Sequence, residues 1–222
     1  FDEHGKYLRR IGKCGQGPGE YVQIYDFTIN KKTGCIVILT GLSKVYLYSL
    51  EGEFKMSKQV SKSLLWNIAS NDCGYLMSSN HNTYTEGENA YLLYAFDSDF
   101  NLTGRWVHVL PEQMPTLPLL SSTLQTVGNE VYCCDTFTNS IYTYNCDVDS
   151  VIKKYNILFS VPMPDHIFAN VMDFMEKQRD YDFISEVVIN EDNMLLGYIH
   201  QGRYNLAIIG SDGSIVRNGQ YS

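Results

Sequence analysis

The feature that most constrains the fold is a segment that recurs about every 48 residues along this chain of 222 residues. Each copy resembles the end of one strand, a tight turn and the start of the next strand. The five copies begin at Phe1, Tyr48, Phe96, Tyr144 and Ile209, so their spacings are 47, 48, 48 and 65 residues. Four of the copies carry an acidic residue three places in, at Glu51, Asp99, Asp147 and Asp212. Such a recurrence predicts repeated supersecondary units.

Each unit contains four short runs in which apolar and polar residues alternate. In the second unit these are "LWNIAS", "GYLMSS", "AYLLYAF" and the run that follows the turn. Alternation with β-branched and aromatic residues, bounded by Gly, Asp and Asn, indicates antiparallel strands. Four-stranded sheets at this period are typical of β-propeller blades, which bury both faces by stacking around an axis. A β-sandwich is the alternative, and three nearly equal spacings favour the propeller.

The chain is therefore predicted to be an all-β protein with a single β-propeller domain over residues 1–222. A partial blade at 1–20 precedes four whole blades at 21–61, 62–110, 111–160 and 161–222. The longest spacing exceeds the others because of "VPMPDHIFANVMDFMEKQRDYDF". We expect an α-helix inserted at 165–178, with Asp165 as N-cap and an apolar stripe of Phe168, Val171, Met172 and Met175. This helix would pack on the propeller surface; the alternative is that it lids one face or docks a partner.

Composition excludes some classes of partner. The net charge of −8 and the lack of long basic runs argue against nucleic-acid binding. No apolar run approaches the roughly 18 residues of a membrane-spanning helix. The six cysteines have no zinc-like spacing, and the adjacent Cys133 and Cys134 would point to opposite faces of a strand. We therefore expect no metal and no cofactor, and mostly buried free thiols; a disulfide between strands remains an alternative.

The glycine-rich stretch "IGKCGQGPGEY", Ile11 to Tyr21, tests the idea of a phosphate-binding loop. Such a loop leads into a helix N-terminus, whereas "YVQIYDFTI" follows here and alternates like a strand. The phosphate interpretation therefore fails. We interpret the stretch instead as a crossover from the outermost strand of one blade to the innermost strand of the next. Its glycines would permit positive φ, and Pro18 would fix one backbone angle.

This stretch also carries a family resemblance. "GKYLRRIGKCGQGPGEY" followed by "IYDFTI" resembles a bacterial family of six-bladed β-propellers related to NHL-repeat proteins, with Gly15, Gly17, Pro18 and Gly19 as structural motif residues. "VYCCDTFTNSIYTYN" is a second match. There the resemblance implies that Asp135 and Asn139 bond the hairpin backbone between the central strands.

The resemblance further implies an exported lipoprotein of gut commensals, in the periplasm or at the cell surface, with a lipid anchor upstream. Six blades of this size would need roughly 290 residues. We therefore expect the chain to be a fragment of a six-bladed ring.

Propeller ligands usually bind to loops at one mouth of the central channel. The polar candidates for ligand binding are Glu20, Tyr21, Trp66, Asn67, His81, Asn82, His200, Arg203 and Tyr204. Each has a structural alternative. Glu20 would accept bonds from its own glycine-rich loop, Trp66 would pack between blades, and His81 and His200 would be solvated hairpin residues.

No motif for nucleophilic catalysis or metal binding occurs, so we assign no catalytic residue. The favoured function is a non-enzymatic, exported recognition or scaffold module that binds a glycan, a peptide or a partner protein. Two alternatives remain. One is a propeller-type lyase or hydrolase that uses carboxylates at the channel mouth or a metal, and the other is a structural subunit of a surface assembly.

Overall fold

The computed structural model describes residues 2–81, 90–109, 123–168 and 170–220. These residues form four antiparallel sheets of four strands each, and within each sheet every strand pairs with its neighbours in the sequence. Blade 1 comprises β3 (Ile24–Asn30), β4 (Cys35–Thr40), β5 (Lys44–Ser49) and β6 (Phe54–Gln59), with a short 3-10 turn at Gly41–Ser43. Blade 2 comprises β7 (Asn67–Asn71), β8 (Gly74–Ser78), β9 (Tyr91–Phe96) and β10 (Leu102–His108).

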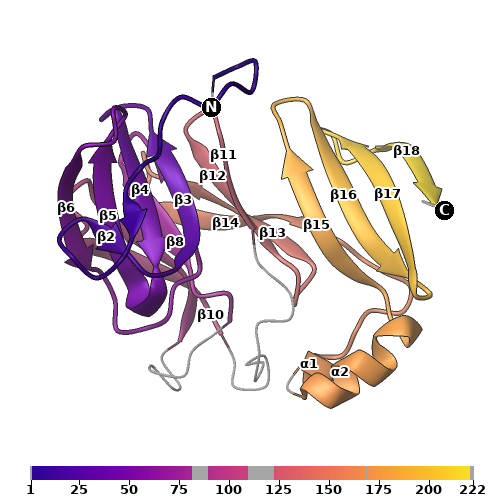
Figure 1. The fold of residues 1–222 in the computed structure, drawn as a ribbon. Helices are drawn as coiled ribbons and strands as arrows, with labels where there is room; N and C mark the ends of the chain where they lie inside the picture. The colour runs from indigo at the N-terminus through magenta and orange to yellow at the C-terminus, as the bar shows by residue number, and fades with distance from the viewer. Residues whose placement is uncertain (1, 82–89, 110–122, 169, 221–222) are drawn as a thin grey trace.

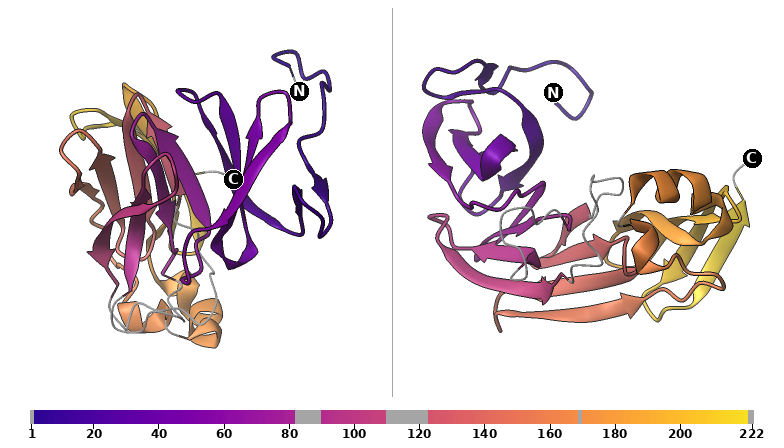
Figure 2. Two further views of the ribbon diagram at one scale, coloured as in Figure 1. Left: turned by 90° about the vertical axis from the view of Figure 1, so that its left-hand side faces the viewer. Right: turned by 90° about the horizontal axis from the view of Figure 1, so that it is seen from below.

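The second half of the chain repeats this arrangement. Blade 3 comprises β11 (Thr123–Val127), β12 (Glu130–Asp135), β13 (Ser140–Asn145) and β14 (Ser150–Asn156). Blade 4 comprises β15 (Phe183–Ile189), β16 (Asn193–His200), β17 (Arg203–Gly210) and β18 (Ile215–Gln220). The first strands of successive blades pack side by side, β3 on β7, β7 on β11 and β11 on β15. The blades therefore follow one another along a curve (Figures 1 and 2), and the predicted all-β propeller fold is confirmed.

Alternation along each strand sends side chains into two different interfaces. Val37 and Leu39 of β4 pack against blade 2, whereas Ile36 and Ile38 point to the outward flank of blade 1. In β12, Cys133 packs with blade 2 and Cys134 packs with blade 4, as their adjacency predicted. Each blade thus contributes to two cores, and no single sheet has a core of its own.

Polar side chains of the first strands also link the blades. The Ile68 N–H donates to Asp26 Oδ2 at 2.9 Å, and Thr126 Oγ1 donates to the Ser70 carbonyl at 2.8 Å. Gln125 bonds β15 twice, because its Nε2 donates to the Val187 carbonyl and its Oε1 accepts from the Ile189 N–H. The described strands of different blades do not pair through their backbones, so these side-chain hydrogen bonds connect the sheets instead.

The recurring turns are held by the side chain two residues before the acidic position. Ser49 Oγ, Asp97 Oδ1 and Asn145 Oδ1 accept the N–H groups of Glu51, Asp99 and Asp147 respectively. In the last copy Asp212 Oδ1 itself accepts the Ser214 N–H. Short side chains that bond the backbone two residues ahead are typical turn formers.

The leading segment differs in part from the expectation for a partial blade. No strand forms at Lys6–Ile11, and only β1 (Lys13–Cys14) and β2 (Glu20–Tyr21) pair, in parallel. Without a neighbouring strand, the backbone of Lys6–Ile11 has no ladder to join. The segment lies against the outward flank of blade 1, where an added Cβ at Gly19 (φ +71°) would come within 2.7 Å of the Phe54 ring. Positive φ and close approach together explain this glycine.

The inserted helical segment is broken into two. α1 (Asp165–Phe168) and α2 (Val171–Lys177) are followed by a 3-10 turn at Gln178–Asp180. Asn170 caps α2, since its side chain accepts the N–H groups of Met172 and Asp173. Because of this break, α2 turns a different set of side chains toward the protein than a continuous helix would. Met172 and Met175 are therefore exposed, contrary to the predicted stripe, and Ile167 and Phe174 are buried instead.

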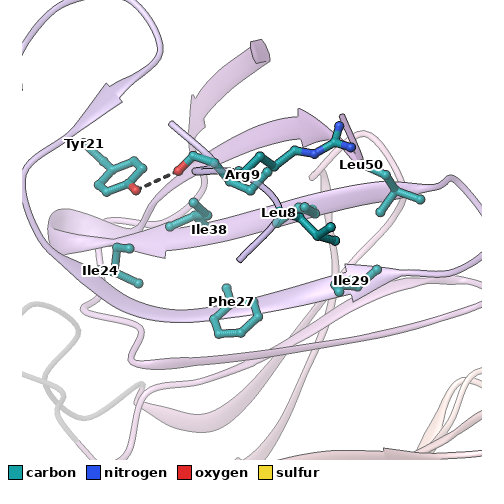
Figure 3. A pocket seen from close by; sticks show the side chains of 10 residues that line it. Leu8, Arg9, Tyr21, Ile24, Phe27, Ile29, Ile38 and Leu50 are labelled. Atoms are coloured by element: carbon teal, nitrogen blue, oxygen red, sulfur yellow. Dashed lines mark hydrogen bonds between the residues drawn. The ribbon is translucent and has the colours of Figure 1, made fainter. Parts of the chain in front are cut away.

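Both outer flanks of the blade series expose apolar side chains. Phe27 and Ile29 of β3 are exposed on blade 1, beside a cavity of about 430 Å³ that Leu8, Ile38 and Leu50 also line (Figure 3). On blade 4, Val188 and Leu195 are exposed, and Leu195 lines a cavity together with Leu206 and Ile208. The expectation that further blades cover these flanks stays a prediction.

A disulfide joins blades 2 and 3. Cys73 and Cys146 are linked across 73 residues, while Cys35, Cys133 and Cys134 are buried free thiols and Cys14 is an exposed one. The cross-link connects the turn between β7 and β8 with the turn between β13 and β14. The alternative that the sequence left open, a disulfide between strands, therefore applies to one pair of the six cysteines.

Replacing both linked cysteines should destabilise the fold. By the loop-closure model, a cross-link over 73 residues lowers the free energy of the folded state relative to the unfolded state by about 4 kcal/mol. The double variant Cys73→Ser/Cys146→Ser should lose about that much in urea unfolding. Cys14→Ser, at an exposed thiol, should change the unfolding free energy by less than about 0.5 kcal/mol. Equal stability of the double variant and the native chain would contradict the cross-link.

Candidate functional site

Alternate connections of the antiparallel strands fall on the same face of the blade series. We call the helix face the set of connections at 41–43, 60–66, 79–81, 136–139, 157–182 and 201–202, which includes α1 and α2 (Figure 1). The turn face carries the remaining turns, at 31–34, 50–53, 72–73, 97–101, 128–129, 146–149, 190–192 and 211–214. Four of the nine predicted polar candidates lie on the helix face or at a strand end next to it: Trp66, Asn67, His81 and His200.

A buried histidine–aspartate pair lies at the helix face between blades 2 and 3. His81, just after β8, places its Nε2 2.8 Å from Asp135 Oδ1 at the end of β12. The two side chains are 1% and 0% exposed. The expectation that His81 is a solvated hairpin residue was therefore wrong. The sequence gives no sign of this burial, because the partner lies 54 residues away in another blade.

Asp135 is held by several donors. Besides His81, the Phe137 N–H donates to Oδ1 at 3.1 Å and Thr138 Oγ1 donates to Oδ2 at 2.6 Å. Burial alone would raise the pKa of this carboxyl. The charge and hydrogen bond of His81, with the bonds from Thr138 and Phe137, outweigh burial and hold the pKa of Asp135 below its ordinary value. Asp135 thus fixes its own hairpin and binds the neighbouring blade.

Asn139 acts between blades. The family resemblance implied that Asn139 bonds the backbone of its own hairpin. In the structure its Oδ1 instead accepts the Ile184 N–H of β15 in blade 4, at 3.2 Å. Its φ of +52° turns the backbone at the end of the loop. Both motif residues of this hairpin therefore connect blade 3 to a neighbour, one on each side.

The helical segment packs beside the His81–Asp135 pair. Phe137 lies 4.5 Å from the His81 ring, centroid to centroid, and belongs to an apolar cluster with Met163, Ile167, Phe174 and Phe183. α1 and α2 therefore cover part of the helix face through this cluster.

A second histidine–aspartate pair lies beyond the same cluster. His200 Nδ1, at the end of β16, is 2.8 Å from Asp182 Oδ1, and Asp182 Oδ2 accepts the Val161 N–H. Asp182 is buried, whereas the His200 side chain is 44% exposed. With Nδ1 held by the carboxylate, Nε2 is the ring nitrogen left to face solvent or a ligand.

Aromatic rings meet at the helix face between blades 1 and 2. Tyr25 of β3 and Trp66, just before β7, stack in parallel with centroids 4.5 Å apart. Both are half-buried. Next to them, burial raises the pKa of Asp26, against the opposing bonds from the N–H groups of Ile68 and Phe27 and from the Asn67 side chain. Trp66 of blade 2 thus contacts blade 1 through Tyr25, while part of its side chain remains exposed to solvent.

Buried polar atoms without a hydrogen-bond partner gather on the same face. Among the described residues these atoms belong to Ser63, Trp66, Asn67, His81, Thr136 and Thr143. All but Thr143 lie in helix-face connections or at the helix-face end of a strand. Each such atom costs about 1–3 kcal/mol when nothing pairs with it, so a concentration of them needs a physical reason.

The remaining predicted residues lie elsewhere. Glu20 accepts the Gly17 N–H at 2.9 Å and pairs with Lys13, so it holds its own loop, as the structural alternative required. Tyr21 donates to the Ile11 carbonyl at 2.9 Å on the outward flank of blade 1 (Figure 3). Both are therefore separated from the helix-face groups.

Arg203 and Tyr204 belong to β17. Arg203 donates to Gln220 and is exposed, and Tyr204 donates to Glu186. Burial and the Glu186 carboxylate raise the pKa of Tyr204 to about 12. Asn82 lies outside the described residues. The candidates that the structure gathers on the helix face are therefore Trp66, Asn67, His81 and His200, with Arg203 next to the last.

Sequence reasoning missed Tyr25, Asp26 and Asp182 as parts of this face. Tyr25 and Asp26 stand in an ordinary strand pattern, and Asp182 lies just after the inserted helices. No local pattern marks any of the three as part of this face, because each finds its partner on another strand.

Comparison with known proteins places the chain in a family. A family model described as a domain of unknown function, DUF4934, matches residues 1–220. The chain belongs to the DUF4934 family. No curated protein matches its sequence. In the described part of this DUF4934 chain, no helix has the length and apolar character needed to cross a membrane.

Solved structures share the fold of this DUF4934 chain. One, a "Putative exported protein" of Bacteroides fragilis, aligns with a TM-score of 0.79 at 18% identity over 100% of this chain and 64% of its own. U3-55K aligns at 0.58 with 10% identity over 98% of this chain and 56% of its own. The β-propeller domain of Cps50 (Swd1) from Myceliophteria thermophila aligns at 0.52 with 13% identity over 90% and 57%. The chain thus spans less than two thirds of each.

Asp135→Asn should destabilise the fold in a pH-dependent way. Replacing the buried carboxylate removes the charged acceptor that His81, Thr138 and Phe137 bond, which costs about 2–3 kcal/mol at neutral pH. The native carboxyl has a pKa below its unfolded value of about 3.9. Its contribution is therefore fully present above that value and is lost as the pH falls through the lower, folded value. Urea unfolding between pH 3 and 7 should show the difference between native and variant shrinking below about pH 4.

Asp99→Asn is the matched control, because Asp99 is exposed in a turn. Its unfolding free energy should stay within about 0.5 kcal/mol of the native chain. A loss for Asp135→Asn that did not vary between pH 3 and 7 would show that the charge of Asp135 is not what stabilises this interface.

Proposed function

We propose that this chain is a recognition module that binds its ligand on the helix face, and that the ligand is a glycan. The observation that carries the proposal is the gathering of unpartnered buried polar atoms on this face, beside a half-buried pair of stacked aromatic rings. These atoms are buried, so water held between the ligand and this face would give them their missing partners. The turn face carries no comparable group among the described residues.

The chemistry around Trp66 favours a neutral, polyhydroxylated ligand. A sugar ring has an apolar C–H face and a rim of hydroxyls, so it needs a flat aromatic surface next to hydrogen-bonding groups. Trp66 supplies the ring. The Asn67 amide nitrogen already bonds Asp26, so its Oδ1, which has no partner, is the acceptor left close by. A peptide or a partner protein on the same face is the alternative.

A catalytic function is the second candidate, and the His200–Asp182 pair favours it. The buried carboxylate orients the imidazole so that Nε2 is available as a base. This arrangement would suit a hydrolase or lyase that uses a carboxylate on the helix face. Fold likeness alone does not decide between binding and catalysis.

The exposed apolar flanks of blades 1 and 4 would suit the third candidate function, a structural subunit of a surface assembly.

We also infer that the protein acts outside the cytoplasm, as a lipoprotein-type propeller of six NHL-like blades. The disulfide supports an oxidising compartment, and the similar Bacteroides fragilis protein is named as exported. The apolar flanks of blades 1 and 4 support further blades on either side, since equivalent surfaces between blades 1 to 4 are buried. The membrane that holds an upstream lipid anchor would decide between the periplasm and the cell surface.

Substitution of Trp66 should abolish ligand binding while the fold persists. On a glycan array the native chain should bind a defined set of glycans, and Trp66→Ala should weaken that binding at least ten-fold, as expected for a central aromatic contact. Trp66→Phe keeps the ring without the N–H and should fall between the two. Val148→Ala, at an exposed turn-face position, is the control and should bind like the native chain.

Thermal unfolding of each variant separates loss of fold from loss of binding. Binding that survives Trp66→Ala but weakens with Val148→Ala would place the ligand on the turn face and overturn the proposal. Peptides retained instead of glycans, with the same dependence on Trp66, would overturn the ligand class alone.

A further inference from the structure

The turn face brings sulfur and carboxylate ligands from two blades together. Cys73 lies in the turn between β7 and β8 of blade 2, and Cys146 follows β13 of blade 3. Their Cα atoms are 6.1 Å apart. A carboxylate oxygen of Asp147 and the two Sγ atoms all lie within 4.8 Å of one another. This group has nothing to do with the helix face, so it does not depend on the proposed function.

The two turns are held in place by bonds other than the disulfide. Asn129, in the turn between β11 and β12, accepts the Asp72 N–H on its Oδ1 at 2.8 Å, and its carbonyl accepts from Asn71 Nδ2 at 3.4 Å. Its own Nδ2 lies 3.7 Å from Cys146 Sγ. The apolar core between blades 2 and 3 lies behind them. Both sulfurs would therefore stay close together after the S–S bond is broken.

The group is accessible and its surroundings are acidic. Cys73 and Asp147 are exposed, and a cavity of about 220 Å³ lies beside the two sulfurs. Asp97, Asp149 and Tyr144 also line this cavity, and the lining contains no lysine or arginine among the described residues. Carboxylates around an open site attract divalent cations and leave them room to enter.

We propose that the reduced pair, Cys73 and Cys146, together with Asp147, forms a binding site for one thiophilic divalent cation such as Zn²⁺. Two thiolates and a carboxylate are ligands that zinc commonly takes, and water would complete a tetrahedral set. The distances between the three ligand atoms suit a single ion between them after small movements of the side chains. The spacing rules of the sequence did not find this site, because its ligands come from two blades.

The site forms when the Cys73–Cys146 disulfide is reduced to two thiols. A phosphine or dithiol reductant supplies two electrons, the S–S bond breaks, and each sulfur takes up one proton; the phosphine becomes its oxide with oxygen from water, or the dithiol becomes a disulfide. The cation then displaces both thiol protons and is held by two thiolates and the Asp147 carboxylate. A low-molecular-weight disulfide then accepts two electrons from the thiolates and takes up two protons from water to become two thiols, which restores the Cys73–Cys146 bond and releases the ion. Blades 2 and 3 are thus joined by a covalent bond in one state and by a metal in the other.

Titration with Cd²⁺ tests the site directly, with the ultraviolet charge-transfer band of cadmium–thiolate bonds as readout. The native chain reduced with a phosphine should bind one Cd²⁺ per chain, and a large excess of Zn²⁺ should compete for the same site and weaken the band. The oxidised chain should show no such band. It is the matched control, because its four other cysteines are free thiols in both states.

Variants assign the ligands. Cys73→Ser and Cys146→Ser should each remove the stoichiometric band, Cys14→Ser should leave it unchanged, and Asp147→Asn should weaken binding roughly ten-fold. Asp147→Asn keeps both cysteines, so it remains informative if a cysteine variant fails to fold. Zn²⁺ should also raise the unfolding temperature of the reduced native chain but not of Cys73→Ser.

Two results would overturn the proposal. One is the absence of a stoichiometric band in the reduced native chain. The other is a band of equal strength and affinity in the oxidised chain or in Cys73→Ser, which would place the cation on other thiols.

Discussion

The structure depends on the burial of each blade between its neighbours. A four-stranded sheet has two apolar faces, and here side chains alternate so strictly that adjacent residues, such as Cys133 and Cys134, enter different cores. Burial of apolar surface is the main favourable term in folding, at about 25 cal/mol per Å². No sheet of this chain can therefore be stable alone, and the outer flanks of blades 1 and 4 remain apolar and exposed.

The fold follows from local pattern, and this is why sequence reasoning reached it. Strand alternation, turn residues and the period of about 48 residues are all set within a single blade. The helix was harder, because one polar residue, Asn170, caps α2 and shifts the phase of the segment after it. The stripe through Met172 and Met175 assumed one continuous helix, so it predicted the wrong buried face.

The candidate site depended on contacts between blades, which the sequence does not reveal. His81 has no local feature that distinguishes a buried histidine–aspartate pair from a solvated loop, since Asp135 is the end of a different strand. The same is true of Tyr25 and Trp66, and of Cys73 and Cys146. Trp66 was found because an aromatic residue just before a strand is notable by itself. Its partner was not, because tyrosine is common in this chain.

Blades 2 and 3 are linked to each other at both ends of their strands. The Cys73–Cys146 bond joins them at the turn face, and the His81–Asp135 pair joins them at the helix face. Rotation of these two sheets relative to each other would have to break the disulfide or the His81–Asp135 contact. Between blades 1 and 2 the described residues make only noncovalent contacts, such as the hydrogen bond from the Ile68 N–H to Asp26. Tyr25 and Trp66 stack across that junction, so a ligand on these rings would contact two sheets that only packing and hydrogen bonds hold together.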